Sequence, residues 1–491
     1  MAHSAGPRPP SGMLTDLYQL TMAYAYWKTG ITSTEACFHL YFRGNPFDGG
    51  YSVACGLAQA IEYIEALRFT AEDTAYLATL TGGDGTPLFS EEFLEWLAGF
   101  RFTGTVLGVP EGTVVFPQEP LLRVIGPIAE CQLVETALLN IINFQTLVAT
   151  KAARVRLAAQ GDPVIEFGLR RAQGPDGALS ASRAAYIGGC VATSNVLAGQ
   201  VHGIPVGGTH AHSLVMVFDT ELEAFMAYAE VMPNNAVLLV DTYDTLEGVR
   251  NAIRAGDRLR ELGHDLVGVR IDSGDLAWLS KRARELLDAA GFEGARVYAS
   301  NELDEHTIES LKKQGARIDV WGVGTKMVTA YDQPALGGVY KLSAIREPGG
   351  KWEPRVKVSE QTAKVTTPGL LQVRRFTDAE GVFAGDMIYD ELVPPGSPCI
   401  MVDPADATRR TSYCGTDDAE DLLLPVFERG RLVYEVPSIA ASRERAIEQI
   451  GHLDPNHVRL LNPHVYKVGV ELGLFERKTA LILAARGIAE G

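Results

Sequence analysis

The chain has 491 residues, of which 46% are hydrophobic and 21% charged, and its formal net charge at pH 7 is −17. This length allows two or three domains, and the composition is that of a globular protein. The acidic balance argues against broad nucleic-acid binding, which needs basic surface, so no nucleic-acid partner is expected. No apolar run approaches the roughly 20 residues of a membrane span, so no membrane partner is expected either.

The N-terminus and the cysteines bear on location. Residues 1–12 are rich in Ala, Ser, Gly and Pro and lack the apolar core of a signal peptide, so we predict a short disordered lead there. The six cysteines, at positions 37, 55, 131, 190, 399 and 414, show no C-x-x-C spacing. They are expected to be reduced, buried thiols, which fits a cytoplasmic protein.

Three further segments follow the lead. Residues 13–126 mix helical and strand-like stretches and predict an N-terminal α/β domain. Residues 127–335 begin with a long helical pattern and then alternate apolar strands with amphipathic helices, which indicates parallel βα units. Roughly five or six such units fit a barrel related to the (β/α)₈ fold. The first unit does not open with a G-x-G-x-x-G motif, which weakens the alternative of a dinucleotide-binding fold. Residues 336–491 are predicted to form a strand-rich segment that returns to the N-terminal domain, followed by C-terminal helices at 438–453, capped by Ser438, and at 463–486.

The ends of the predicted barrel strands are polar, and function belongs at these ends in such a barrel. Arg170 and Arg171 form a pair that can bind phosphate, and the Gly-x-Gly-Thr run ending at Thr325 suits a phosphate cradle. The other strand ends carry Thr209, His210, His212, Asp241, Arg270, Asp272, Asp275, Ser300 and Glu302. The three aspartates supply oxygen ligands of the kind that Mg²⁺ prefers. The set predicts a phosphate-rich substrate with a divalent metal, although helix capping or surface ion pairing explains each residue taken singly.

Residues 206–218, Val-Gly-Gly-Thr-His-Ala-His-Ser-Leu-Val-Met-Val-Phe, combine a flexible turn with two histidines. Paired glycines let backbone N–H groups face a bound anion. A histidine beside such a turn can accept a phosphoryl group or move a proton. The alternative is a strand, a turn and a buried histidine that only packs.

An ordered set of motifs runs along nearly the whole chain: TDLYQLTM (15–22), FRGNPF (42–47), EFGLRRAQGPDG (166–177), GTHAHS (208–213), VDTYD (240–244), VRIDSGD (269–275), GVGT (322–325) and GVYKL (338–342). In these motifs the chain resembles the nicotinate phosphoribosyltransferase family, and the ordered set is more specific than any one motif. The resemblance implies an α/β fold: an irregular (β/α) barrel of the type II phosphoribosyltransferase kind, with a smaller N-terminal α/β domain and C-terminal helices.

The resemblance also implies a reaction. Nicotinate, 5-phosphoribosyl 1-pyrophosphate, ATP and water would give nicotinate mononucleotide, pyrophosphate, ADP and phosphate, a step of NAD salvage. Mg²⁺ would be the cofactor, and the protein would be a homodimer. ATP would be coupled through phosphorylation of His212, not His210, by position in the Gly-Thr-x-Ala-His-Ser motif. His210 is expected to be a packing residue or to support the site from outside.

The family's site residues carry over by the same resemblance. Nicotinate would lie between Tyr18, which reaches across a dimer interface, and Phe167, and would contact Thr209 and Arg270. The phosphoribosyl substrate would contact Arg171, Gly324 and Thr325. Asp241 and Asp272 would lie near the ribose and the metal, and the metal ligands themselves are not assigned.

Two alternatives remain open at this point. A nicotinamide or quinolinate phosphoribosyltransferase would share the fold, and nicotinamide relatives place an acid near the ring amide. Ser194 occupies the nearest corresponding position here, which favours the acid substrate nicotinate. The second alternative is a protein without turnover that senses phosphorylated metabolites on the same fold.

Overall fold

The computed structural model describes residues 12–360, 365–413 and 419–488, which form two compact units. Unit 1 comprises Met1–Leu147 and Ala335–Gly491, and unit 2 comprises Val148–Pro334. Residues 127–147, which we grouped with the barrel, fall in unit 1. The predicted lead lies outside the described residues apart from Gly12, and so does Cys414, whereas the other five cysteines are buried.

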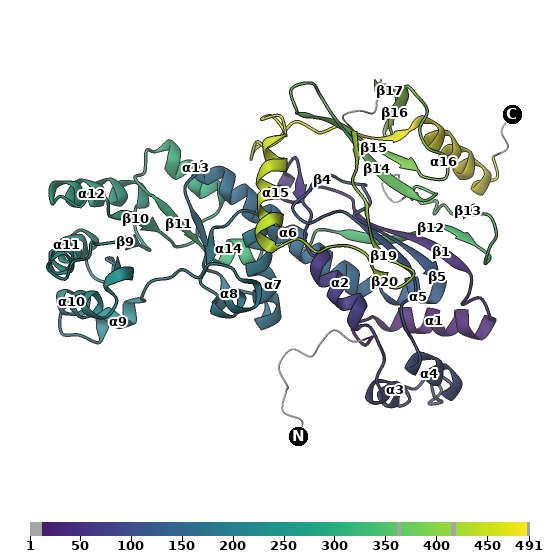
Figure 1. The fold of residues 1–491 in the computed structure, drawn as a ribbon, viewed down its shortest axis with the longest axis horizontal. Coiled ribbons are helices and arrows are strands. Elements are labelled where there is room, and N and C mark those ends of the chain that lie inside the picture. Colours follow the sequence, from purple (N-terminus) through teal and green to yellow (C-terminus); the bar gives the residue numbers. More distant parts are fainter. Residues whose placement is uncertain (1–11, 361–364, 414–418, 489–491) are drawn as a thin grey trace. The chain divides into compact units, whose positions relative to one another are not determined.

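Unit 1 contains a seven-stranded sheet built from both ends of the chain (Figure 1). Its order is β13 (Glu353–Pro354), β12 (Gly338–Arg346), β1 (Glu35–Phe42), β5 (Leu122–Pro127), β3 (Thr105–Gly108), β19 (Leu424–Glu428) and β20 (Arg431–Leu432). The central strand β1 is buried along almost its whole length and pairs antiparallel with β12 and β5. Residues after 336 therefore complete a sheet that the N-terminal strands begin.

A second sheet of unit 1 comes entirely from the last third of the chain. Its order is β17 (Asp406–Tyr413), β16 (Cys399–Asp403), β21 (Val468–Glu471), β15 (Phe383–Asp390), β14 (Leu371–Thr377) and β18 (Ala419–Asp421). A two-stranded sheet joins β2 (Ser52–Val53) to β4 (Val114–Val115). The helices are α1 (Leu17–Thr29), α2 (Leu57–Ala66), α3 (Ala71–Leu77), α4 (Glu91–Ala98), α5 (Ile128–Leu133), α15 (Ile439–Gly451), α16 (Leu472–Ala485) and the first half of α6 (Glu135–Ala159).

The C-terminal helix prediction is half correct. Helix α15 begins where predicted, and the Ser438 hydroxyl accepts a hydrogen bond from the Ala441 N–H. The helix predicted over 463–486 is wrong in its first part, because β21 precedes α16. A Cβ on Gly469 would lie 2.4 Å from Met401 Cγ, so the glycine lets β21 pack closely beside β16. Tertiary pairing with β15 and β16 thus fixes an extended segment that local sequence does not signal.

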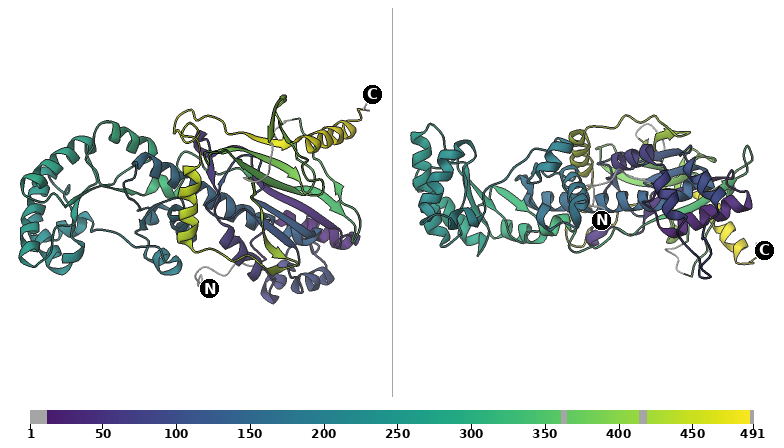
Figure 2. Two further views of the ribbon diagram at one scale, coloured as in Figure 1. Left: turned by 45° about the horizontal axis from the view of Figure 1, so that its top comes forward. Right: turned by 90° about the horizontal axis from the view of Figure 1, so that it is seen from below.

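Unit 2 is built on six parallel strands, which confirms the predicted α/β class. Their order is β7 (Ala192–Thr193), β6 (Val164–Glu166), β11 (Val320–Val323), β10 (Arg296–Ala299), β9 (Gly268–Ile271) and β8 (Val237–Leu239). The helices are α7 (Gly174–Ile187), α8 (Val196–His202), α9 (His212–Met216), α10 (Glu221–Val231), α11 (Thr245–Glu261), α12 (Leu276–Ala289), α13 (Glu305–Lys313) and α14 (Thr325–Val328). Helices α10 to α13 lie outside the strands (Figures 1 and 2).

Strands β7 and β8 form the two edges of the described sheet and do not pair with each other. An irregular segment connects them instead. On the β7 side, the Thr193 N–H donates to Pro205 O at 3.0 Å, and the Gly207 N–H donates to Thr193 O at 3.0 Å. The strand predicted before Thr209 is reduced to this single bridge between Thr193 and Val206. Pro205 lacks an N–H and glycines follow Val206, so a longer strand is not supported here. The barrel is irregular at this seam.

A buried ion cluster attaches α6 to α13 within unit 2. Lys151 Nζ lies 2.7 Å from Glu305 Oε2, and Arg154 Nε lies 2.8 Å from Glu305 Oε1. The Glu305 side chain has no solvent-exposed surface. Burial opposes ionisation of this carboxyl, but the charges of Lys151 and Arg154 outweigh burial, so the pKa of Glu305 is lowered. Glu305 is therefore held as a carboxylate between two cations.

Removing that carboxylate should destabilise unit 2 strongly. We expect Glu305→Ala to lower the free energy of unfolding by about 3–5 kcal/mol, because the buried Arg154 and Lys151 lose their shared carboxylate, while Lys151 keeps its pair with Asp332 at 2.7 Å. Glu309→Ala on the same helix is the matched control. Among the described residues Glu309 forms an ion pair with the exposed Lys313 alone, so its loss should change stability by about 0.5 kcal/mol or less. Urea unfolding of both variants measures the difference, and equal effects would contradict the assigned role.

Candidate active site

A cavity of about 380 Å³ in unit 2 lies at the carboxyl ends of the parallel strands. The predicted residues that line it are Phe167, Arg171, Thr209, His212, Arg270, Asp272, Gly324 and Thr325. They come from the ends of β6, β9 and β11 and from the seam segment, so distant parts of the sequence meet in one cavity. Ser194 and His210 also line it.

Phe167 is positioned by a buried carboxylate directly before it. Glu166 ends β6, has no solvent-exposed surface, and accepts hydrogen bonds from the Gly168 N–H, the Ser182 hydroxyl at 2.8 Å and the Thr193 hydroxyl at 2.6 Å. These three bonds tie the turn after β6 to α7 and β7. The turn that presents Phe167 to the cavity is thus held from three sides.

Gly322 in β11 and Gly324 directly after it leave room for the Phe167 ring and backbone. A Cβ on Gly322 would lie 2.7 Å from the ring, and a Cβ on Gly324 would lie 2.9 Å from the Phe167 carbonyl oxygen. Gly324 therefore permits the approach of the Phe167 backbone, whether or not it also touches a substrate. A side chain at either glycine would displace the ring or the backbone of Phe167, which lines the cavity.

Arg270 is the centre of the polar half of the cavity. Its Nε donates to Ser300 Oγ at 2.8 Å, one terminal nitrogen donates to Thr209 Oγ1 at 3.0 Å, and the other donates to Asp272 Oδ1 at 3.1 Å. The guanidinium carbon lies 5.3 Å from the centroid of the Phe167 ring. A guanidinium has five N–H groups, so one N–H on each terminal nitrogen remains beyond these bonds. Two N–H groups of one guanidinium can donate together to a carboxylate.

The sequence marks Ser300 only as a polar residue at a strand end, yet its side chain helps to hold Arg270. Its hydroxyl accepts from Arg270 Nε and donates to Asp272 Oδ1, so it connects the two charged side chains. Its place at the end of β10, next to β9, was the available sequence signal. Asp275, in contrast, accepts from the Trp278 N–H at 3.0 Å and caps α12, so its local environment favours the capping interpretation over metal binding.

His212 stands at the first turn of α9 against the end of β8. Its Nδ1 lies 3.1 Å from the Thr242 hydroxyl, and its Nε2 lies 4.0 Å from Asp241 Oδ1. The His212 side chain is 41% exposed, whereas that of Asp241 is 1% exposed. Asp241 lies behind the cavity wall, where its second oxygen accepts from the Asp272 N–H and the Ser273 hydroxyl. Oδ1 of Asp241 has no hydrogen-bond partner among the described residues, so it is available to the imidazole.

The opposite end of the cavity carries the predicted phosphate ligands. Arg171 donates to the Thr325 hydroxyl at 3.1 Å and pairs with Glu302 at 2.7 Å. Lys326 pairs with Asp304 at 2.5 Å, which attaches the start of α14 to the cap of α13. Both Arg171 and Glu302 are about half exposed, so an anion entering the cavity can compete with Glu302 for the guanidinium.

Tyr18 is the predicted site residue that lies in unit 1. It sits in the first turn of α1 and is 46% exposed. Burial of the hydroxyl and the negative charge of Glu135 raise the pKa of Tyr18 to about 12, so the phenol is neutral near pH 7. The ring is available for stacking.

The described residues contain no group of three or more His, Cys, Asp or Glu side chains arranged to hold a metal ion. Asp272 lines the cavity and Asp241 lies behind its wall; both are used in hydrogen bonds, with Asp241 Oδ1 remaining, while the cavity carboxylate Glu302 pairs with Arg171. Mg²⁺ commonly keeps waters and binds through one or two carboxylates together with substrate phosphates. These residues fit a metal that enters with a phosphorylated substrate.

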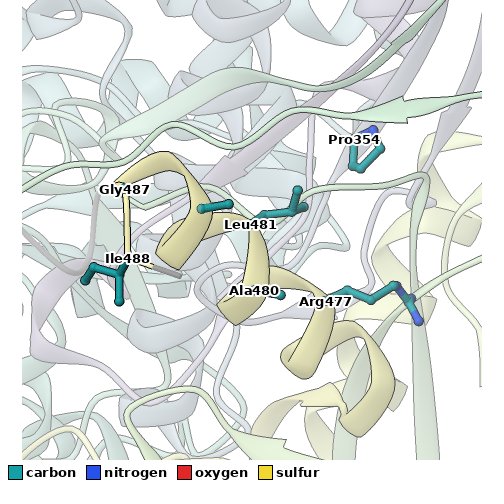
Figure 3. A pocket seen from close by; sticks show the side chains of 7 residues that line it. Pro354, Arg477, Ala480, Leu481, Gly487 and Ile488 are labelled. Atoms are coloured by element: carbon teal, nitrogen blue, oxygen red, sulfur yellow. The ribbon is translucent and has the colours of Figure 1, made fainter. Parts of the chain in front are cut away.

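A second hollow, of about 750 Å³, lies beside α16 in unit 1 (Figure 3). It is lined by Pro354, Arg477, Ala480, Leu481, Ala484, Gly487 and Ile488. Apart from Arg477, its side chains are apolar or absent, and among the described residues no acid, hydroxyl or histidine lines it. It offers no group for the chemistry predicted above, so we assign the active site to the cavity in unit 2.

Fold and site together define an α/β-barrel protein with a polar small-molecule site at the carboxyl ends of its strands. The chain is 47% identical over 472 residues to nicotinate phosphoribosyltransferase of Bacillus subtilis, covering 94% of both chains. It is 37% identical over 535 residues to the protein of that name from Homo sapiens, covering 97% of this chain and 96% of the relative. The chain belongs to the nicotinate phosphoribosyltransferase family.

The domain and structure comparisons agree. Residues 13–143 match the nicotinate phosphoribosyltransferase N-terminal domain, and residues 371–478 match the C-terminal domain. The crystal structure of human nicotinic acid phosphoribosyltransferase superposes with a TM-score of 0.82 at 34% identity, covering 95% of this chain and 99% of that one. No helix among the described residues is long and apolar enough to cross a membrane.

Proposed function

We propose that the protein joins nicotinate to 5-phosphoribosyl 1-pyrophosphate, forming nicotinate mononucleotide and pyrophosphate, and that ATP drives the reaction through His212. The observation that carries the proposal is the pair of N–H groups that Arg270 retains beside the Phe167 ring. An aromatic carboxylate matches this arrangement, because its ring can stack on Phe167 while its carboxylate accepts from Arg270. Thr209 adds a hydroxyl next to the guanidinium.

In the transfer step, the pyridine nitrogen of nicotinate attacks C1 of the ribose while the bond from C1 to pyrophosphate breaks. The nitrogen lone pair forms the new bond, so no general base is required. Positive charge develops on the sugar and negative charge on the leaving pyrophosphate. Arg171 and the Thr325 hydroxyl bind the phosphorylated end, and the carboxylates of Asp241 and Asp272 suit the cationic sugar.

When Mg²⁺ is bound, it would neutralise part of the negative charge on the leaving pyrophosphate. We assign it to Asp241 and Asp272 together with substrate oxygens, which agrees with the small number of carboxylates near the cavity.

ATP coupling is assigned to His212. A ring nitrogen of His212 attacks the terminal phosphorus of ATP, ADP leaves, and water later releases phosphate from the histidine. The buried Asp241 carboxylate, 4.0 Å from the ring, stabilises the positive charge that the imidazole develops. The phosphoryl group adds negative charge beside the Thr209–Arg270 pair, so it can change substrate binding in the cavity.

We also propose a homodimer, as the family resemblance implies. We propose that Tyr18 of a second copy of the chain covers the face of nicotinate opposite Phe167. Its exposed ring and neutral phenol suit stacking on a pyridine ring. A cytoplasmic location remains a prediction from the sequence.

The deciding experiment measures pyrophosphate release with Mg²⁺ and the phosphoribosyl substrate, with nicotinate or nicotinamide, each with and without ATP. Turnover with nicotinate that rises with ATP supports the whole proposal. Turnover with nicotinamide alone would assign the protein to the amide reaction. Binding of the phosphoribosyl substrate in calorimetry, without any pyrophosphate release, would support a sensor.

Substrate choice can be tested at Ser194, which lines the cavity. We expect Ser194→Asp to raise the Michaelis constant for nicotinate about tenfold, because a second carboxylate repels that of the substrate. Nicotinamide carries no charge, so its use should not fall in parallel. Ser194→Asn has nearly the same size without the charge and is the control. An equal loss in both variants would show that size, not charge, governs this position.

A further inference from the structure

The second histidine of the seam segment, His210, has contacts that the proposed reaction does not use. Its Nε2 accepts a hydrogen bond from the Leu239 N–H at 3.1 Å, and its Nδ1 lies 3.3 Å from the carbonyl oxygen of Ala211. The ring packs against Tyr228 of α10, with the ring centroids 4.9 Å apart. The imidazole is therefore fixed by two hydrogen bonds and an aromatic neighbour.

The Leu239 N–H belongs to the edge of the sheet. In the parallel pairing of β8 with β9, the Val240 N–H donates to Arg270 O, so the N–H one residue earlier points away from β9. No further strand lies on that side of β8 in the described sheet. His210 Nε2 thus takes the place of the carbonyl oxygen that a neighbouring strand would offer.

We infer that His210 is a positioning residue, which closes the barrel seam onto β8 and thereby holds the Thr209–His212 loop in its reactive arrangement. Thr209, directly before it, bonds to Arg270 on β9, and His212, two residues later, contacts Thr242 just after β8. His210 lies between these two contacts and joins the same loop to β8. The inference rests on the proposed phosphorylation of His212.

The role requires one tautomer of a neutral ring. Nε2 must have its lone pair to accept from Leu239, so the proton is on Nδ1, where it can face the Ala211 carbonyl. Burial lowers the pKa of His210, and the positive charges of Arg270 and His212 lower it further. The hydrogen bond to Ala211 raises this pKa, but the net shift is downward. The environment therefore favours a neutral His210 ring, whose Nε2 accepts the hydrogen bond from the Leu239 N–H.

The test compares His210→Phe, which keeps an aromatic ring but offers no acceptor, with His210→Gln, whose side-chain carbonyl can accept from Leu239. His306→Gln is the matched control, because His306 is exposed on α13. The first readout is the rate at which ATP phosphorylates the protein. We expect about a tenfold loss in His210→Phe and a rate close to that of the parent in His210→Gln and the control.

The second readout is hydrogen–deuterium exchange of a peptide spanning β8, with melting temperatures to verify folding. His210→Phe should speed exchange at Leu239, and His210→Gln should restore its protection. Equal phosphorylation in all variants, or equal losses in His210→Phe and His210→Gln, would overturn the inference. If the parent accepts no phosphate from ATP, the proposed coupling fails instead. Exchange at Leu239 then decides the inference, and unchanged protection in His210→Phe refutes it.

Discussion

Replacing His212 by alanine should leave turnover that no longer responds to ATP. The substitution removes the only side chain at this end of the described cavity that is both nucleophilic and placed beside a buried carboxylate. Nicotinate should still bind, because Arg270 and Thr209 contact each other independently of His212. We therefore expect the rate with ATP to fall to the rate without it.

Two measurements define that result. Pyrophosphate release is followed with and without ATP, and the protein is assayed for acid-labile, alkali-stable phosphate, which marks phosphohistidine. His306→Ala is the control, since His306 is an exposed histidine on α13. It should retain both the stimulation and the phosphate. A His212→Ala protein that still responds to ATP would show that the phosphoryl group is carried elsewhere or not at all.

The convergence of the predicted residues could be deduced from the sequence because parallel strands end at the same edge of a sheet. Thr209 and Arg270 are 61 positions apart, yet Arg270 lies near the carboxyl end of β9 and Thr209 follows the bridge at Val206, and their side chains bond directly. Arg171 and Thr325 are 154 positions apart and meet for the same reason. Periodicity and strand ends were sufficient to place these groups, while their chemical roles came from family resemblance.

The supporting contacts could not be deduced in this way, because they depend on side-chain direction in the folded state. Nothing local distinguishes Asp241, whose carboxylate is buried behind the wall, from Asp275, which caps a helix. Glu166 looks like any strand-end acid until Ser182 and Thr193 are seen to donate to it. In each case the decisive partner comes from another element.

The predictions for the seam segment and for strand β21 were wrong for a related reason. Both are short extended segments whose hydrogen bonds go to strands far away in the sequence. The four residues of β21 give too little alternation for a strand to be recognised, whereas at the seam a strand is predicted and only the bridge between Thr193 and Val206 forms. The helical pattern of α16 directly follows β21, so the sequence predicts one helix over both.

Arg270→Ala should cause the largest loss of nicotinate use of any substitution in the cavity. The variant removes two N–H donors proposed for the substrate carboxylate, and it also removes the partner of Asp272. Charge-assisted hydrogen bonds contribute about 1.5–3 kcal/mol each, so losing two of them should lower kcat/KM for nicotinate roughly 10²–10⁴-fold. Much of it should appear as a raised Michaelis constant, because the lost contact already exists in the substrate complex.

Arg270→Lys separates geometry from charge. Lysine keeps the positive charge but cannot offer a planar pair of donors or reach Thr209, Ser300 and Asp272 together. We expect it to recover only a small part of the loss in nicotinate use. Nicotinamide gives the complementary measurement, since an amide gains little from a cation and any residual turnover with it should fall less in both variants. An unchanged Michaelis constant for nicotinate in Arg270→Ala would exclude pairing between this guanidinium and the substrate carboxylate, leaving Arg270 as a support for Asp272 and Ser300 alone.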